Sequence, residues 1–312
     1  MSILLIGNFS DAQYAIWRSH LLLHLPQNES LVVATQEHDK SAVEIALVAN
    51  APVGPLSHLP NLRFVQSLWS GVERLLSDAT LPSNIPIARL VDPAMAQTMV
   101  ECAIAHVLYL HRQVPAYLKQ QSDRTWRQLP QPAASSRPIG VLGLGQMGYA
   151  VARALARLGF PVMGWSLNPR NHSDIECHWG AQGLAKLSAT AQILINLLPL
   201  TPRTAGILNE DLFEQLPIGA AIVNLGRGGH LVEQHLLAAL ARHRLSHAVL
   251  DVFNEEPLPA DHAFWTHPKI TVFPHVAAHT DPGTAARIVC ENIAAFRAGR
   301  EVTGLVSLSA GY

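Results

Sequence analysis

The chain has 312 residues, of which 49% are hydrophobic and 14% charged, and its formal net charge is −1. This length suits two domains of the usual roughly 100–200 residues, and the low charged fraction argues against a disordered chain. A net charge near zero gives no field that would attract a nucleic acid or an anionic membrane. No apolar run reaches the roughly 18–20 residues of a membrane-spanning helix.

The cysteines bear on the compartment. Cys102, Cys177 and Cys290 are widely spaced and form no C-x-x-C motif. An odd number of isolated cysteines is typical of free thiols in a reducing environment, so we expect a cytoplasmic protein.

Residues 1–95 read as a small α/β unit, because short apolar runs alternate with a helix-like segment at residues 12–25. This alternation is typical of βαβ units and a parallel sheet. The apolar runs are SILLIG (2–7), SLVVAT (30–35), EIALVAN (44–50), RFVQSLW (63–69) and IPIARL (85–90).

A long helical pattern follows over residues 96–121, with apolar residues such as Met99, Ala103 and Val107 at helical spacing until Pro115 bends or ends it. This segment reads as a bridging helix, and a loop rich in proline and serine follows it. A second α/β series then runs from residue 139 to 274, and its apolar strands predict helices on both faces of a parallel sheet.

The predicted fold class is therefore α/β, with two doubly wound, Rossmann-like parallel-sheet domains and a cleft between them. The first expected domain comprises residues 1–98 and is completed by residues 284–312. The second expected domain comprises residues 99–283.

The motif GVLGLGQMG places Gly143, Gly145 and Gly148 in G-x-G-x-x-G spacing, between an apolar strand and the helix YAVARALARLG. The first glycine permits a tight turn, the second lets the backbone approach a pyrophosphate, and the third allows close packing of helix and strand. This context predicts a dinucleotide site.

The segment GWSLNPR (164–170) lacks the acid that holds the ribose of NAD about 20 residues after such a loop. Ser166 and Asn168 stand there instead, and Arg170 can pair with a 2′-phosphate. NADPH is therefore the expected cofactor and NADH a weaker one. The alternative is that Arg170 is a solvated loop residue and both cofactors are accepted.

Three chemically active side chains follow later strands of this domain: Arg227 in VNLGRGG, Glu256 in DVFNEEPLP and His275 in VFPHVAAHT. The carboxyl ends of strands in an open α/β sheet line the ligand crevice, so these side chains should converge near the nicotinamide. Arginine can bridge carboxylate and carbonyl oxygens, and a histidine oriented by a carboxylate can transfer a proton.

The order of the motifs GLGQMG, NLLPLTPRT, NLGRGG, DVFNEEPLP and PHVAA resembles the D-2-hydroxyacid dehydrogenase family. The Trp-Ser pair after the second strand and the closing GLVSLSAGY resemble its glyoxylate/hydroxypyruvate reductase A subgroup. The resemblance implies catalytic roles for Arg227, for His275 as acid/base and for Glu256 as its partner. It also implies NADPH-dependent reduction of glyoxylate to glycolate and of hydroxypyruvate to D-glycerate.

The resemblance further implies that residues 1–98 with 284–312 form the substrate-binding domain and residues 99–283 the dinucleotide-binding domain. The substrate carboxylate is held by the glycine loop at Trp69, Ser70, Gly71 and Val72, where Ser70 stands in place of a glycine that many members carry and Trp69 narrows the pocket. Arg227 and His275 complete the substrate site. The cofactor residues, with Asp251 at the carboxamide, are Gly143, Gly145, Gln146, Met147, Gly148, Ser166, Asn168, Arg170, Leu198, Pro199, Thr204, Leu225, Gly226 and Asp251.

A homodimer is also implied, with residues 99–135 crossing between subunits and Trp126 reaching toward the neighbour's active site. Two other functions stay open: an NADH-dependent D-lactate-type dehydrogenase, and a dinucleotide-sensing binding protein without catalysis. His230 and His279 either line the active site or cap helices.

No metal site is expected. His20 and His24 lie one helical turn apart without a third ligand, so they indicate an ordinary helix surface. Residues 171–180, NHSDIECHWG, carry several potential ligands in no zinc spacing and are expected to form a solvated loop beside the cofactor.

Overall fold

The computed structural model describes residues 2–82 and 84–307, which form two compact units. Unit 1 comprises Met1–Met95 and Thr280–Tyr312, and unit 2 comprises Ala96–His279. The expected boundaries, after residues 98 and 283, lie three and four residues further along the chain. The motif GLVSLSAGY begins at Gly304, and its last five residues, 308–312, lie outside the described part.

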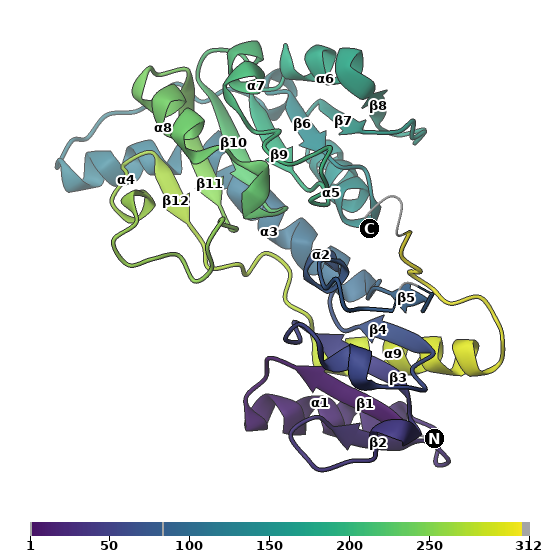
Figure 1. The fold of residues 1–312 in the computed structure, drawn as a ribbon. Helices are drawn as coiled ribbons and strands as arrows, with labels where there is room; N and C mark the ends of the chain where they lie inside the picture. Colours follow the sequence, from purple (N-terminus) through teal and green to yellow (C-terminus); the bar gives the residue numbers. More distant parts are fainter. Residues whose placement is uncertain (1, 83, 308–312) are drawn as a thin grey trace. The chain divides into compact units, whose positions relative to one another are not determined.

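Unit 1 is built on a parallel sheet with the strand order β2-β1-β3-β4-β5 (Figure 1). Helices are inserted between parallel strands because each connection must return to the same end of the sheet. The strands are β1 (Ser2–Gly7), β2 (Ser30–Val33), β3 (Val43–Ala49), β4 (Phe64–Ser67) and β5 (Ile87–Ala88), and the helices are α1 (Asp11–His24), α2 (Glu73–Leu76) and α9 (Pro282–Arg297).

The sequence specifies the ends of α1 and α9 locally. Ser10 begins α1 with a capping box, in which its side chain and that of Gln13 satisfy each other's backbone amides. Asp281 caps α9 by accepting from the Thr284 amide, and Pro282 occupies the first turn, where no amide donor is needed. Phe296 of α9 stacks on Phe64 of β4 with centroids 4.7 Å apart, so the last helix of the chain completes the first unit.

Unit 2 holds a second parallel sheet, in the order β12-β11-β10-β9-β6-β7-β8 (Figure 1). The chain first moves outward from β6 to β8 and then continues on the other side of β6 from β9 to β12. The direction reverses between β6 and β9, and open α/β sheets bind ligands beyond the carboxyl ends of strands at such a point. The strands are β6 (Ile139–Leu142), β7 (Val162–Ser166), β8 (Glu176–Trp179), β9 (Ile193–Asn196), β10 (Ala220–Asn224), β11 (Leu245–Leu250) and β12 (Ile270–Val272).

In the described part of the chain, six helices lie wholly or partly in unit 2. The first of them, α3, begins in unit 1 and continues into unit 2. They are α3 (Pro93–His111), α4 (Val114–Ser122), α5 (Gln146–Arg157), α6 (Gly180–Ser188), α7 (Glu210–Gln215) and α8 (Glu233–Ala241). Short 3-10 helices occur at Lys40–Ala42, Pro55–His58, Ala134–Ser136, Gly228–His230 and Ala263–Trp265.

Both faces of the unit 2 sheet are buried, as its continuous apolar strands predicted. Successive side chains of a strand point to opposite faces. Ile193 and Ile195 join one hydrophobic cluster, and Leu194 between them joins the other. The cluster on the Ile193 side includes Met99, Ala103 and Val107 of α3, all of them buried, so the helical spacing in the sequence marks a buried face.

Two local expectations change. The long helical pattern is broken at Gln113, which has a left-handed φ of 57°, before Pro115 is reached, so that proline lies in the first turn of a separate helix where its missing donor costs little. The segment 171–180 was wrongly expected to be wholly a loop. Glu176–Trp179 form the edge strand β8, because parallel pairing with β7 satisfies backbone groups of these residues. His178 of this strand is buried.

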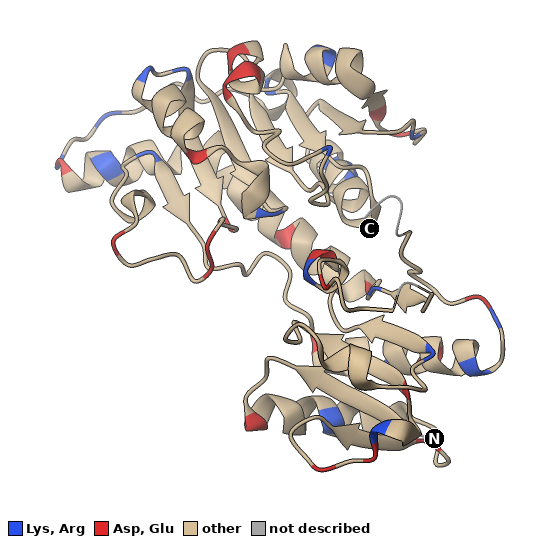
Figure 2. Ribbon diagram, in the orientation of Figure 1, with Lys and Arg blue, Asp and Glu red and all other residues tan. Residues whose placement is uncertain are grey.

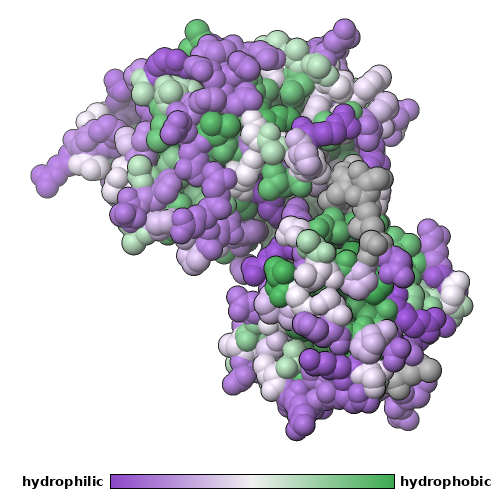
Figure 3. All heavy atoms as spheres, viewed as in Figure 1, coloured by the Kyte–Doolittle hydropathy of each residue, from purple (hydrophilic) through white to green (hydrophobic). Residues whose placement is uncertain are grey.

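Acidic and basic residues are interspersed on both units (Figure 2). On the face drawn in Figure 3, small groups of hydrophobic residues lie between hydrophilic ones. Over residues 2–82 and 84–307, no helix is both long and apolar enough to cross a membrane.

Candidate active site

The glycine loop connects β6 to α5, and its three glycines differ in what requires them. Gly143 has a φ of +99°, and a Cβ on Gly148 would lie 1.7 Å from the carbonyl oxygen of Gly143, so turn and packing require these two. A Cβ on Gly145 would meet nothing within 4 Å. Packing inside the protein therefore does not require glycine at position 145. A ligand that approaches the N-terminus of α5, such as a pyrophosphate, does explain a glycine there.

The loop after β9 is held by hydroxyl and amide groups. Thr204 is fully buried, and its hydroxyl donates to the Pro199 carbonyl at 2.7 Å and accepts from the Thr201 amide at 2.9 Å. Leu198 is buried and Pro199 is partly exposed. The Thr204 hydroxyl thus fixes the turn that carries Leu198 and Pro199.

Two buried asparagines, Asn196 and Asn224, were not singled out in the sequence. They lie at the ends of β9 and β10, and the Asn196 amide donates to the Asn224 side-chain oxygen at 2.9 Å. Asn224 also accepts from the Gly226 amide at 3.3 Å and donates to the Arg227 carbonyl at 3.1 Å. An asparagine at the end of an otherwise apolar buried strand is the signal that could have identified them, because a buried amide needs partners.

Arg227 follows β10, directly after the buried Leu225 and Gly226, and its guanidinium donates to the Gly226 carbonyl at 2.7 Å. His230 is fully buried, accepts from the Arg227 amide at 3.1 Å and contacts the Pro199 carbonyl at 3.2 Å. His230 therefore ties the arginine turn to the turn after β9. Its ring faces the protein interior.

Glu256 and His275 are joined by a hydrogen bond, with 2.7 Å between the carboxylate Oε2 and the imidazole Nδ1. The other oxygen, Oε1, accepts from the Phe253 amide at 2.9 Å. Burial opposes ionisation of Glu256, but the hydrogen bonds from His275 and Phe253 and the charges of His275 and Arg227 outweigh it, so the pKa of Glu256 is lowered. A charged carboxylate thus fixes one ring nitrogen and leaves the other, Nε2, for chemistry.

Asp251, at the end of β11, shapes the turn that carries His275. Its fully buried carboxylate accepts from the Val276 amide at 2.8 Å and the Ala277 amide at 2.9 Å, and its carbonyl accepts from the His275 amide at 2.8 Å. These bonds hold His275 at a φ of 55°, which non-glycine residues seldom adopt. Burial raises the pKa of Asp251, partly offset by the two amide hydrogen bonds.

The segment after β7 contains the residues expected to choose between cofactors. The Ser166 hydroxyl donates to the Asn168 carbonyl at 2.7 Å, which closes a tight turn at the strand end. Asn168 and Arg170 are exposed, and Arg170 makes no hydrogen bond or ion pair with the residues that the structure describes. Gln146 and Met147 open α5 beside the glycine loop.

The expected substrate loop, Trp69–Val72, lies in unit 1 between β4 and α2. The Ser67 hydroxyl accepts from the Trp69 amide at 3.1 Å, and the Trp69 carbonyl accepts from the Leu90 amide at 3.0 Å. The Trp69 ring meets Phe9 and Trp17 edge-on, each with centroids 6.1 Å apart. These contacts fix the indole and leave Ser70 and Gly71 partly exposed.

Trp126 and His279 both lie at the protein surface, and Trp126 is 98% exposed. Among the described residues, no group of three or more histidine, cysteine, aspartate or glutamate side chains is placed to hold a metal ion.

Known proteins share this fold over the full chain. A family model described as "D-isomer specific 2-hydroxyacid dehydrogenase, NAD binding domain" matches residues 104–277. The chain is 40% identical to glyoxylate/hydroxypyruvate reductase A of Serratia proteamaculans and 39% identical to that of Yersinia enterocolitica, and each comparison covers all of both chains.

Two crystal structures resemble this chain over its full length. A D-isomer specific 2-hydroxyacid dehydrogenase from Xanthobacter autotrophicus, in complex with NADPH and MES, matches with a TM-score of 0.94 and 35% identity. An NADPH-dependent glyoxylate/hydroxypyruvate reductase from Sinorhizobium meliloti, in complex with NADP and sulfate, matches with a TM-score of 0.93 and 33% identity. Both comparisons cover 100% of this chain and 99% of the other.

Proposed function

Because the chain belongs to the D-isomer specific 2-hydroxyacid dehydrogenase family, we propose that it catalyses the NADPH-dependent reduction of small 2-keto acids. Glyoxylate, reduced to glycolate, and hydroxypyruvate, reduced to D-glycerate, are the first substrates. The observation that carries the proposal is the Glu256–His275 pair at 2.7 Å, in the same unit as the glycine loop and Arg227.

The reaction needs a carboxylate anchor and a proton donor. Arg227 binds the substrate with its planar guanidinium, which can contact a carboxylate and a carbonyl oxygen together, and the amides near Ser70, Gly71 and Val72 hold the carboxylate. His275 donates a proton to the developing alkoxide from Nε2, while Glu256 holds Nδ1 and stabilises the imidazolium. Trp69 narrows the pocket.

The bound nicotinamide cofactor supplies the hydride. Gly143, Gly145 and Gly148 with the amides of Gln146 and Met147 receive its pyrophosphate. Asp251 lies at the carboxamide end of the cofactor in this proposal, and its hydrogen bonds to the turn that carries His275 support that place. The sides of the site are formed by Leu198, Pro199, Thr204, Leu225 and Gly226.

NADPH is preferred over NADH in this proposal, because Ser166 ends β7 and Asn168 and Arg170 follow it, where an acid would repel a 2′-phosphate. The exposed Arg170, without a protein partner among the described residues, supports this preference. The crystal structures from Xanthobacter autotrophicus and Sinorhizobium meliloti, which hold NADPH and NADP, support it as well.

The initial rate of absorbance loss at the nicotinamide band tests the function, with glyoxylate and hydroxypyruvate and with NADPH and NADH in parallel. Turnover that is faster with NADPH is the expected result. Equal or faster turnover with NADH would overturn the cofactor preference. Tight cofactor binding without turnover of any 2-keto acid would overturn the enzymatic function and leave a dinucleotide sensor.

The proposal also includes a cytoplasmic homodimer in which residues 99–135 cross between subunits. The 98% exposure of Trp126, which lines a surface hollow together with the exposed Tyr117, supports a second protein surface there. The free thiols Cys102 and Cys177 support a reducing compartment. A monomeric mass in light scattering would contradict the dimer.

A further inference from the structure

A group of contacts between α5 and the loop after β7 has no part in the roles proposed above. The Tyr149 hydroxyl donates to Asp174 Oδ1 at 2.8 Å, and Arg153 Nε lies 2.9 Å from Asp174 Oδ2. Tyr149 and Arg153 belong to the helix that begins at the glycine loop, and Asp174 belongs to the loop 167–175 between β7 and β8. We name these three residues the α5 clamp.

Ring contacts strengthen the connection. Tyr149 stacks on His172 of the same loop, with centroids 3.8 Å apart and an interplanar angle of 16°. The Arg153 guanidinium lies over the same Tyr149 ring, at 5.5 Å from its centroid. A short antiparallel bridge between His172 and Ile175 folds the loop at this point. The loop is therefore attached to α5 near its end, and residues 167–171 lie between β7 and this attachment.

Residues 167–171 include Asn168 and Arg170, shortly after Ser166 at the end of β7. In a Rossmann-like sheet the segment after the second strand contacts the adenosine ribose. Asp174 is the only acid in the loop 167–175, and both of its oxygens are engaged by the clamp. The hydrogen bond from Tyr149 is the largest cause that lowers the pKa of Asp174; burial opposes it, and a backbone hydrogen bond and the charges of Arg153 and His172 add to it, so the carboxylate is charged but paired.

We propose that the α5 clamp is a positioning device for NADPH specificity. Tyr149 and Arg153 hold Asp174 and thereby present Ser166, Asn168 and Arg170 to the 2′-phosphate, while they keep the one acid of the loop away from it. This inference rests on the proposed preference for NADPH. It assigns roles to Tyr149, Arg153 and Asp174, which lie outside the residues proposed above to touch the cofactor.

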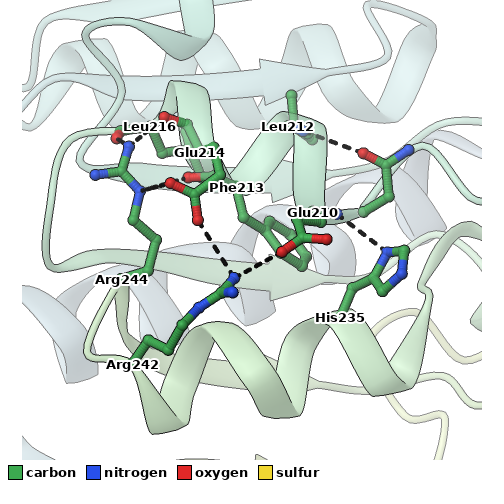
Figure 4. A network of polar contacts seen from close by, with 9 residues as sticks. Glu210, Leu212, Phe213, Glu214, Leu216, His235, Arg242 and Arg244 are labelled. Atoms are coloured by element: carbon green, nitrogen blue, oxygen red, sulfur yellow. Dashed lines mark hydrogen bonds and ion pairs between the residues drawn. The ribbon is translucent and has the colours of Figure 1, made fainter.

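Tyr149→Phe is the most informative variant, because it removes the hydroxyl and retains the ring that stacks on His172. Changes at Asp174 or Arg153 would alter the charge around the phosphate and mix two effects. Glu210→Gln is the matched control: Glu210 forms an exposed 2.8 Å pair with Arg242, which connects α7 to the end of α8 in the same unit (Figure 4).

The first measurement is binding of adenosine 2′,5′-bisphosphate and of 5′-AMP by titration calorimetry. The first probe carries the 2′-phosphate and the second does not, so the ratio of their dissociation constants isolates its recognition. Tyr149→Phe should lower the preference for the bisphosphate about threefold to tenfold, as expected for the loss of one hydrogen bond. Glu210→Gln should keep the wild-type ratio.

The second measurement is amide hydrogen exchange over residues 167–175, which a purely electrostatic effect would not change. Tyr149→Phe should exchange faster there, and Glu210→Gln should not. A Tyr149→Phe variant with the wild-type ratio, or with wild-type exchange in the loop, would overturn the role of the clamp. A wild-type protein that binds both nucleotides equally would overturn the NADPH preference itself, and the clamp's role with it.

Discussion

Gly145 offers a test that separates cofactor binding from folding. Its backbone has a φ of −70° and a ψ of −171°, which any residue adopts, and an added Cβ would meet nothing within 4 Å. Gly145→Ala should therefore fold normally. Alanine restricts the unfolded chain by about 0.4–1 kcal/mol, but Gly145 is the N-cap of α5, where alanine is disfavoured by a similar amount, so we expect stability to change by less than about 1 kcal/mol and the Tm by less than about 3 °C.

Cofactor binding should respond far more strongly than stability. The methyl group would occupy the space through which a pyrophosphate reaches the amides at the start of α5. We expect the dissociation constant for NADPH to rise at least about tenfold, which corresponds to about 1.4 kcal/mol. Fluorescence titration with NADPH measures this change, and calorimetric melting of the same variant measures stability.

Gly148→Ala is the matched comparison, because its Cβ would lie 1.7 Å from the Gly143 carbonyl oxygen, where real contacts stay beyond 3.0 Å. The backbone must move, so this variant should lose about 1–3 kcal/mol of stability or more. Wild-type NADPH affinity in Gly145→Ala would refute the reasoning. A Tm as low in Gly145→Ala as in Gly148→Ala would refute it too.

Three further results are expected. His275→Ala should lower kcat about 10²–10⁴-fold with either keto acid, since it removes the proton donor, and near wild-type kcat would contradict the assignment. Glu256→Gln should lower kcat/KM about tenfold or more, because a neutral amide stabilises the imidazolium less; the alkaline limb of its pH–rate profile should move to lower pH, and an unchanged profile would count against the pair. Burial lowers the pKa of His106 to about 4, so the unfolded chain, with a usual pKa near 6.5, binds the proton first as the pH falls. The contribution of neutral His106 to the free energy of unfolding is fully present above about pH 6.5. It declines as the pH falls toward 4, and about 2 kcal/mol of it is lost at pH 5. Urea unfolding at pH 7.5 and 5.0 should show a smaller pH effect in His106→Gln than in the wild type, and equal effects would contradict it.

Repeating patterns in the sequence predicted the architecture. Strands buried on both faces carry unbroken apolar runs, and helices carry apolar residues three or four positions apart, so two parallel α/β sheets were readable from the chain. The glycine spacing was equally readable, because turn geometry and helix packing depend on residues within a few positions.

The edge strand Glu176–Trp179 and the helix break at Gln113 were not predicted. The strand is short and polar, and its pairing with β7 supplies the stability that its own sequence lacks. Pro115 correctly predicted that the helix is interrupted, but it did not predict where. The interruption lies two residues earlier, at Gln113, because a residue in the left-handed conformation can end a helix.

Within the candidate site, the sequence by itself determined which residue types follow the strands: Arg227, Glu256 and His275. Only the tertiary structure decided their partners. Glu256 lies 19 residues from His275, and the interior orientation of His230 depends on Pro199, 31 residues away. The Tyr149–Asp174 contact likewise joins residues 25 positions apart. No local pattern encodes such pairs, since the packing of distant segments brings them together.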